Sequence, residues 1–249
     1  LKTNWISSKG KYIEKFEKSF CKFIKSKYAI TVNNGTAALH LAILALGIKK
    51  GDEVIVPSFT YIAPVNVIKY VGANVKFIDS DLSNGQINES DFVKKINSKT
   101  KAIIIPHLYG YLCNLPKIKK ICKRKKIFLI EDCAESFGSF FKKKHSGTFG
   151  DIGTFSFFGS KTITTGEGGM AVTNSENLAR RLMLFRSHGI TSDMDQMQPR
   201  PLDEIWNYQQ IELGFNYRMT DIQAALGLSQ LERLDEFVKR RRVIAQRYN

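Results

Sequence analysis

The sequence has no long apolar run and no paired cysteines. None of its apolar stretches approaches the about 18 residues that span a bilayer, and no signal-peptide pattern opens the 249-residue chain. We therefore expect a cytoplasmic protein with no membrane segment. The four cysteines show neither CxxC spacing nor a nearby histidine at zinc spacing, which predicts reduced thiols and no metal site.

The glycine-rich signatures of nucleotide-binding loops are missing as well. No GxGxxG follows an expected strand, and GSKT at residues 159–162 is not a P-loop because GxxxxGKS/T is absent. A Rossmann dinucleotide site is therefore unsupported. The chain also has no internal repeat, no low-complexity linker and no helix-turn-helix or zinc-finger spacing.

Acidic residues are scarce. The chain has 23 Asp and Glu against 38 Lys and Arg, a net charge of +15, with basic clusters at residues 117–126, 142–144 and 239–242. Such a balance raises the alternative of a non-catalytic regulator that binds nucleic acid. The clusters carry no interleaved aromatic residues, so we interpret them as solvated helix faces or hairpin tips, and we do not expect nucleic acid as the partner.

Short apolar runs alternate with helical patterns along the chain. Strands are expected at residues 28–32, 53–56, 75–78, 102–106 and 127–130. This alternation predicts an α/β fold, with a mostly parallel sheet and helices on both faces. We expect residues 1–232 to form one large domain, and residues 233–249 to begin a helix that leads to a C-terminal domain absent from the chain.

Lys161 stands at the centre of the stretch GDIGTFSFFGSKTITTGEGG. An apolar run at residues 154–158 leads directly to Ser160 and Lys161, which would place the amine at the end of a buried strand. Desolvation lowers the pKa of a lysine and leaves more of the neutral amine, the form that makes a Schiff base with a carbonyl cofactor. The alternative is a surface lysine in a loop, which is common in a lysine-rich chain.

Asp132 follows a continuous apolar run at the carboxyl end of an expected parallel strand, where open α/β sheets place their chemistry. An aspartate there can pair with the pyridine nitrogen of pyridoxal 5′-phosphate and keep it protonated. The alternative is a helix N-cap over residues 133–137. A third segment, NNGTAALHLA, breaks from strand to helix at Gly35 and Thr36, and the free amides of a helix N-terminus can bind a phosphate.

These segments together resemble the nucleotide-sugar aminotransferases often named for DegT, DnrJ and StrS. The resemblance implies the fold-type I, aspartate-aminotransferase-like architecture of pyridoxal-phosphate transferases. Within the family the chain is most similar to the perosamine-synthase branch and next to the aminotransferases of the pseudaminic acid route. The shared stretches run from Trp5 to about Leu234: WISSKGKYIEKFE, NNGTAALHLA, GDEVIVPSFTYIAPVNVI, IEDCAESFGS, GTFSFFGSKTITTGEGGM, RSHGI and LGFNYRMTDIQAALGLSQLERL.

The resemblance assigns a role to each of these segments. Lys161 and Asp132 would be catalytic, and Glu135 stands where relatives carry His or Gln. Asn216 and Arg218 would enter the site of a neighbouring subunit, so a homodimer with shared active sites is expected. The implied cofactor-binding residues are Gly35, Thr36, Ala37, Tyr61, Asp132, Glu135, Ser156, Lys161 and Asn216, and the implied substrate-binding residues are Trp5, Ser7, His188 and Arg218.

The resemblance also implies an activity. We expect transfer of an amino group from glutamate to a keto carbon, C4, of a nucleotide-diphosphate 4-keto-6-deoxy sugar. The kinetics should be ping-pong. The product would be used in surface glycan (lipopolysaccharide) or aminosugar biosynthesis. A sugar dehydratase of the same fold is the nearest alternative, but those relatives carry histidine in place of the lysine. His40, His107 and His145 are expected to cap, pack or lie exposed.

Overall fold

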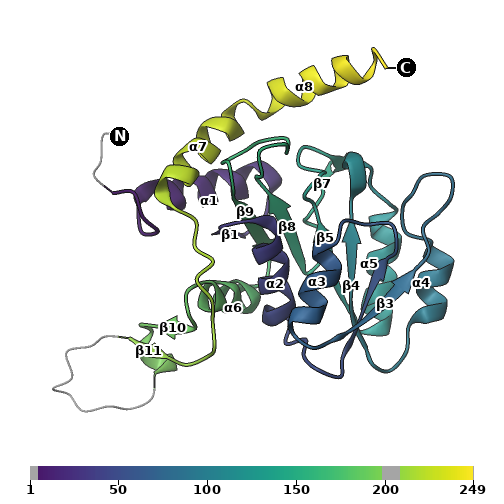
Figure 1. The fold of residues 1–249 in the computed structure, drawn as a ribbon, viewed down its shortest axis with the longest axis horizontal. Coiled ribbons are helices and arrows are strands. Elements are labelled where there is room, and N and C mark those ends of the chain that lie inside the picture. Colours follow the sequence, from purple (N-terminus) through teal and green to yellow (C-terminus); the bar gives the residue numbers. More distant parts are fainter. Residues whose placement is uncertain (1–4, 198–207, 249) are drawn as a thin grey trace.

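A seven-stranded sheet forms the centre of the molecule in a computed structural model that describes residues 5–197 and 208–248 (Figure 1). Its strand order is β1-β9-β8-β5-β4-β2-β3, and only β9 within this sheet runs antiparallel to its neighbours. The predicted mostly parallel α/β fold is therefore confirmed. The strands are β1 (Tyr28–Val32), β2 (Glu53–Pro57), β3 (Asn74–Ile78), β4 (Thr100–Pro106), β5 (Phe128–Asp132), β8 (Ile152–Ser156) and β9 (Gly169–Thr173).

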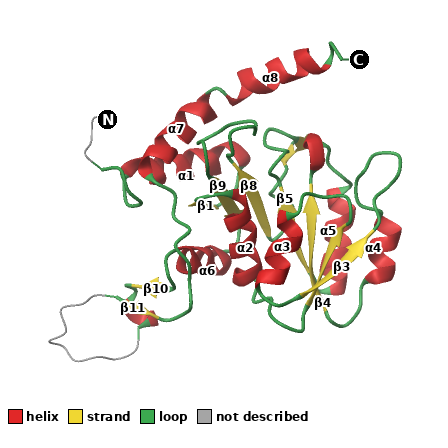
Figure 2. Ribbon diagram, viewed as in Figure 1, coloured by secondary structure: helices red, strands yellow, loops and turns green. Residues whose placement is uncertain are grey.

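Helices cover both faces of this sheet (Figure 2). One face packs against α2 (Gly35–Ala45), α3 (Ala63–Tyr70) and α6 (Glu176–Arg186). The other face packs against α4 (Glu89–Lys95) and α5 (Leu115–Lys125) at one end, and against α1 (Lys11–Ile24) and α7 (Asp221–Glu232) at the other. The smaller elements are β6 (Phe140–Phe141), β7 (Lys144–His145), β10 (Ile190–Thr191), β11 (Gln209–Gln210) and the 3₁₀ turns Leu108–Gly110 and Met194–Gln196.

The burial of each helix follows its sequence pattern. In α1 only one side is apolar, and Phe16 and Phe20 of that side are fully buried against Phe157 and other aromatic side chains. In α5 the buried residues alternate with lysines, so the predicted basic cluster is the solvent face of this helix. Among residues 5–197 and 208–248 no helix combines the length and the apolar content that a transmembrane span requires.

The strand before Lys161 differs from the prediction. It ends at Ser156 instead of residue 158, and Phe157 is buried whereas Phe158 is about half exposed. Lys161 therefore lies in a turn closed by a hydrogen bond from its own amide to the Phe158 carbonyl (2.9 Å). Residues 133–137 likewise form turns and not the helix that an Asp132 N-cap would begin.

The last helix, α8 (Leu234–Ala245), follows α7 after Arg233 and extends away from the sheet (Figure 1). Leu234 is its only residue among those described that is fully buried. Farther along, the Arg241 guanidinium donates to the carbonyl oxygen of Lys161 at 3.0 Å. Residues 233–249 were expected to begin a helix, and the division of the chain between residues 232 and 233 remains a prediction.

Asp221 anchors α1 to α7. Gly10, the N-cap of α1, has no side chain, and Asp221 from the far end of the chain accepts hydrogen bonds from the amides of Tyr12 (2.8 Å) and Ile13 (3.1 Å) instead. A Cβ at position 10 would lie 2.0 Å from the Asp221 carboxyl carbon, so only glycine fits there. The carboxylate thus completes a helix N-terminus that the local sequence leaves uncapped.

We expect Asp221→Ala to lower the free energy of unfolding by about 1–3 kcal/mol, because two amide donors lose their buried acceptor. Asp221→Asn keeps an acceptor oxygen and should lose less. Urea titration followed by circular dichroism measures both variants. Equal stability of Asp221→Ala and the wild type would contradict this interpretation.

Candidate active site

A cavity of about 910 Å³ opens at the carboxyl ends of β4, β5 and β8, beside the N-terminus of α2. This is the edge of an α/β sheet where ligands bind. The cavity brings together residues that are far apart in the sequence. Every residue implied to bind the cofactor lines it except Asn216: Gly35, Thr36, Ala37, Tyr61, Asp132, Glu135, Ser156 and Lys161.

Lys161 faces Glu135 across this cavity. The Lys161 Nζ lies 3.5 Å from Glu135 Oε1, and the lysine side chain is 23% exposed. Glu135 Oε2 also accepts a hydrogen bond from the amide of Tyr109 at 2.9 Å, which fixes the carboxylate. The desolvation expected for the lysine is therefore partial, and its amine is held beside a carboxylate while remaining accessible from the cavity.

Asp132 ends β5 as a buried carboxylate with few partners. Its Oδ1 accepts one hydrogen bond, from the amide of Ala134 at 3.1 Å. Burial raises the pKa of Asp132, whereas that amide and the charges of His107 and Lys161 oppose the rise. A buried anion with so little solvation is stabilised by a cation placed next to it.

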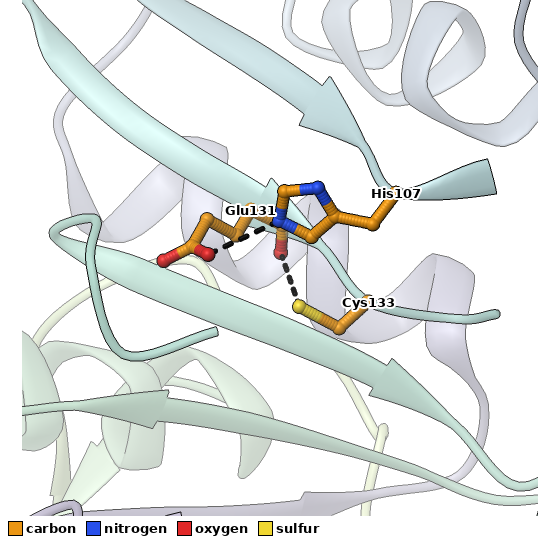
Figure 3. A group of neighbouring side chains, drawn as sticks. All are labelled: His107, Glu131 and Cys133. Carbon is orange, nitrogen blue, oxygen red and sulfur yellow. Dashed lines mark hydrogen bonds and ion pairs between the residues drawn. The ribbon is translucent and has the colours of Figure 1, made fainter. Parts of the chain in front are cut away.

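The neighbouring carboxylate, Glu131, has the opposite environment (Figure 3). Burial by itself would raise its pKa, but the pKa is lowered because His107 and backbone amides donate hydrogen bonds to it. The Nε2 of His107 lies 3.1 Å from Glu131 Oε2. Three amides complete the set: Gly147 at 2.9 Å, Phe149 at 2.7 Å and Gly150 at 2.6 Å. Glu131 is therefore an ionised structural group.

His107, Glu131 and Cys133 lie together, with candidate ligand atoms within 4.8 Å of one another (Figure 3). Both Glu131 oxygens already accept hydrogen bonds. Burial raises the pKa of the Cys133 thiol well above its usual value, and the thiol contacts the Glu131 carbonyl oxygen at 3.9 Å. A cysteine binds a metal ion as its thiolate, and a carboxylate binds one through an oxygen lone pair that is not already used. The raised pKa of Cys133 and the occupied oxygens of Glu131 therefore indicate a hydrogen-bond network and not a metal site.

The N-terminus of α2 forms one wall of the cavity. Asn34 caps the helix, because its side-chain oxygen accepts a hydrogen bond from the Ala37 amide at 2.7 Å. Of the three residues implied to bind the cofactor here, only Gly35 and Thr36 therefore have backbone amides without an acceptor in the helix or its cap. Ser156 packs directly on this turn, because a Cβ at position 35 would lie 2.8 Å from the Ser156 Cβ. Amides and a hydroxyl gathered at a helix N-terminus can bind a phosphate group.

The residues implied to bind substrate lie outside this cavity. Trp5 is half exposed, and the Ser7 carbonyl accepts a hydrogen bond from the Asp221 amide at 3.0 Å. Arg218 is close to this segment, since its Nε donates to Ser8 Oγ at 3.1 Å. Within this chain, therefore, these side chains do not line the cavity that contains Lys161.

His188 and Asn216 form a second group outside the cavity. His188 is exposed and has a left-handed backbone (φ 62°), with its amide bonded to the Phe215 carbonyl at 2.9 Å. Asn216 is exposed in the bridge that it forms with Ser187. Their predicted contacts, with a substrate and with a neighbouring subunit, remain predictions.

Sequence reasoning missed two histidines of the cavity wall, His40 and His107. His40 comes from the buried helix α2, and its Nδ1 lies 3.1 Å from the Tyr217 hydroxyl. Burial lowers the pKa of His40. The only sequence signal was a polar residue inside an apolar run, which by itself does not distinguish a cavity wall from the core.

A lysine, a buried aspartate and a helix N-terminus at one edge of a mostly parallel sheet are the features of fold-type I pyridoxal-phosphate enzymes. The chain belongs to the DegT/DnrJ/EryC1/StrS aminotransferase family, whose sequence profile matches residues 1–249. This confirms the family resemblance that the motifs carry.

Known relatives have the same architecture. The chain is 53% identical over 248 residues to the GDP-perosamine synthase of Escherichia coli O157:H7, and it spans 65% of that protein's length. A Streptococcus pneumoniae protein solved in a PLP form is 29% identical with a TM-score of 0.89, over 99% of this chain and 65% of that one. The GDP-4-keto-6-deoxymannose-3-dehydratase ColD, solved as a mutant with bound GDP-perosamine, is 34% identical with a TM-score of 0.87, over 97% and 65%. The chain thus spans slightly less than two thirds of these relatives.

Proposed function

We propose that the protein is a pyridoxal-phosphate-dependent aminotransferase that moves an amino group from glutamate to C4 of a nucleotide-diphosphate 4-keto-6-deoxy sugar. The observation that carries the proposal is the position of Lys161, 3.5 Å from Glu135 and in the same cavity as Asp132 and the N-terminus of α2. An amine, a bare carboxylate and an anion-binding turn in one cavity are the groups that a phosphorylated pyridine aldehyde requires.

The residues of the cavity fit this cofactor. Asp132 would bind the protonated ring nitrogen, since its buried carboxylate has one hydrogen bond and needs a cationic partner. The amides of Gly35 and Thr36 with the Ser156 hydroxyl would bind the phosphate. The exposed ring of Tyr61 offers a flat face for stacking. Bound in this way, pyridoxal phosphate withdraws electrons from a carbon attached through its aldehyde.

Lys161 has two tasks in this proposal. Its amine would bind the cofactor in the resting protein and, once displaced by the amino donor, would accept the proton of the donor α-carbon and deliver it to the former aldehyde carbon of the cofactor. Glu135 is 3.5 Å away and holds the amine on the cavity side. The turn that carries Lys161 is supported from α8 by Arg241.

The substrate assignment is supported by the relatives. One is named GDP-perosamine synthase and another was solved with bound GDP-perosamine, so we propose a GDP-linked 4-keto-6-deoxy sugar as the acceptor. A dehydratase of the same fold is the alternative that the ColD likeness favours. Lys161 argues against it, because we expect such dehydratases to carry histidine there.

A homodimer with shared active sites belongs to the same proposal. It is supported by the exposure of Asn216 and by the location of Arg218 outside the cavity of their own subunit. The predicted cytoplasmic location, the surface-glycan role and the division of the chain between residues 232 and 233 are likewise part of the proposal.

Incubating the purified protein with pyridoxal phosphate, glutamate and GDP-4-keto-6-deoxymannose tests the function. Mass spectrometry should show a GDP-linked amino sugar and an equal amount of 2-oxoglutarate. A keto sugar that has lost a hydroxyl group without gaining nitrogen would support the dehydratase instead. No change in any nucleotide-linked keto sugar would contradict both.

We expect Asp132→Asn to lower kcat by about 10²-fold or more, because the isosteric amide cannot stabilise a protonated ring nitrogen. The variant can keep the hydrogen bond from Ala134, so the fold should persist. Single-turnover absorbance with glutamate measures the loss. Asp81→Asn, in an exposed loop, is the matched control. Equal rates for Asp132→Asn and this control would contradict the assigned role.

A further inference from the structure

Arg241 of α8 contacts the turn that carries Lys161. Its guanidinium nitrogen Nη2 lies 3.0 Å from the carbonyl oxygen of Lys161 and 3.4 Å from that of Ser160, and it donates to both. A guanidinium offers several N–H donors in a fixed plane, so it can bridge neighbouring carbonyl groups. The contact joins two segments of the chain that are 80 positions apart.

The turn at residues 158–162 has few other ties to the rest of the protein. Phe157 before it and Ile163 after it are buried, so both of its ends are fixed. Between them a Cβ at Gly159 would meet no atom within 4 Å, so the chain is not packed there. Among the described residues, Arg241 provides the only hydrogen bonds that reach the backbone of this turn from outside β8 and the turn itself.

Arg241 continues the buried face of α8. Leu234, Phe237 and Val238 of this helix pack against the hydrophobic cluster between α1 and the sheet. Residues that are three, four and seven positions apart share one helix face, so Arg241 lies on the same face as these three. Val238 also contacts the loop after β5, because a Cβ at Gly138 would lie 3.0 Å from its Cγ2. Apolar packing therefore fixes α8, and the arginine extends the packed face to the turn.

The contact with Arg241 completes the hydrogen bonds of the Lys161 backbone. The Lys161 amide donates to the Phe158 carbonyl at 2.9 Å, and the Lys161 carbonyl accepts from Arg241. Because both of its peptide groups are held, the direction in which the lysine side chain leaves the backbone is held as well. The amine then lies 3.5 Å from Glu135 with only its own side-chain torsions left to adjust.

We propose that Arg241 is a positioning residue for Lys161: by binding the carbonyl groups of Ser160 and Lys161, it holds the lysine amine where it can bond to the cofactor aldehyde. This inference rests on the proposed function. The step that Arg241 assists is a condensation. The ammonium group loses a proton to solvent, the neutral amine adds to the aldehyde carbon and one water molecule leaves, without oxidation or reduction. Orientation of the reacting amine is what the arginine contributes.

The test compares two forms of the cofactor. Pyridoxal phosphate bonds to Lys161, whereas pyridoxamine phosphate has no aldehyde and is held through its ring and phosphate alone. For Arg241→Ala we expect the Kd of pyridoxal phosphate, measured by absorbance, to rise about tenfold, because hydrogen bonds from a charged donor are lost. The Kd of pyridoxamine phosphate, measured by titration calorimetry, should stay within about twofold of the wild type, because its contacts do not involve the turn. A general loosening of the cavity would weaken both forms equally.

Arg241→Lys and Arg240→Ala are the comparison variants. Lysine keeps a charged donor without the planar fork of arginine, so Arg241→Lys should recover part of the loss. Arg240 is exposed on the same helix but is turned about 100° away, so Arg240→Ala removes the same charge and should match the wild type with both compounds. If Arg241→Ala behaves like Arg240→Ala, or weakens both compounds equally, the inference is wrong although the proposed function stands. A wild type that binds neither compound would overturn both.

Hydrogen exchange of the cofactor-free protein provides a second measurement that does not depend on cofactor chemistry. Because Arg241 holds the turn, the peptide that covers residues 158–163 should exchange faster in Arg241→Ala than in the wild type. The peptide that covers β8 should not change, since its amides are held by strand pairing. Equal exchange of the turn in the two proteins would contradict the inference.

Discussion

Lys161→Ala should leave a folded protein that no longer holds pyridoxal phosphate covalently and that transfers amino groups at least about 10³-fold more slowly. The expected loss is large because one amine both binds the cofactor and carries the proton during transfer. The fold should persist, since Lys161 is partly exposed and its backbone bond to Phe158 does not depend on the side chain.

Absorbance spectroscopy and turnover with glutamate measure this effect. Lys161→Arg keeps the charge beside Glu135 without providing a nucleophilic amine, and it should be equally inactive. Lys143→Ala, at the exposed β6–β7 hairpin, serves as the lysine control and should match the wild type. Retention of full activity by Lys161→Ala would show that another residue binds the cofactor.

Glu131→Leu should destabilise the fold by about 3–5 kcal/mol, the largest effect on stability that we expect. The replacement removes the acceptor of His107 and of the amides of Gly147, Phe149 and Gly150 in one step. Donors left buried without an acceptor are costly, as is breaking a buried charged pair. The amides belong to the segment that leads into β8, so the damage should spread toward Ser156 and Lys161.

The pKa of Glu131 gives this contribution a defined dependence on pH. Because the pKa is lowered in the folded state, the stabilisation is complete above the ordinary glutamate pKa and is lost as the pH falls through the lowered value. Urea unfolding at neutral and acidic pH should therefore show the Glu131→Leu deficit shrinking in acid. Glu14→Gln, on the exposed side of α1, should cost little at either pH. A deficit that does not change with pH would contradict an ionised Glu131.

Much of the cavity could be predicted from the sequence because its parts are local patterns. Asp132 directly follows an apolar run, and Gly35 and Thr36 mark a change from strand to helix. In a mostly parallel sheet such strand ends meet at one edge, so separate segments had to converge there. The structure brings them together with Lys161 and Ser156 in one cavity.

Features that depend on distant contacts could not be predicted. The role of Glu131 could not be predicted, because the amides that bind its carboxylate are contributed by residues 147–150. The cap of α1 comes from Asp221, more than 200 positions away along the chain. β8 ends at Ser156, two residues before the end of the apolar run, and Phe157 beyond it is buried because it packs against Phe16 and Phe20.

The most direct test of the account is to identify the residue that holds the cofactor. The purified protein is incubated with pyridoxal phosphate, treated with borohydride to fix the cofactor to the amine that binds it, digested and analysed by peptide mass spectrometry. The account predicts a pyridoxyl group on the peptide that contains Lys161, and its absence if glutamate is added before the borohydride. A label spread over the exposed lysines, or placed on any single lysine other than Lys161, would contradict it.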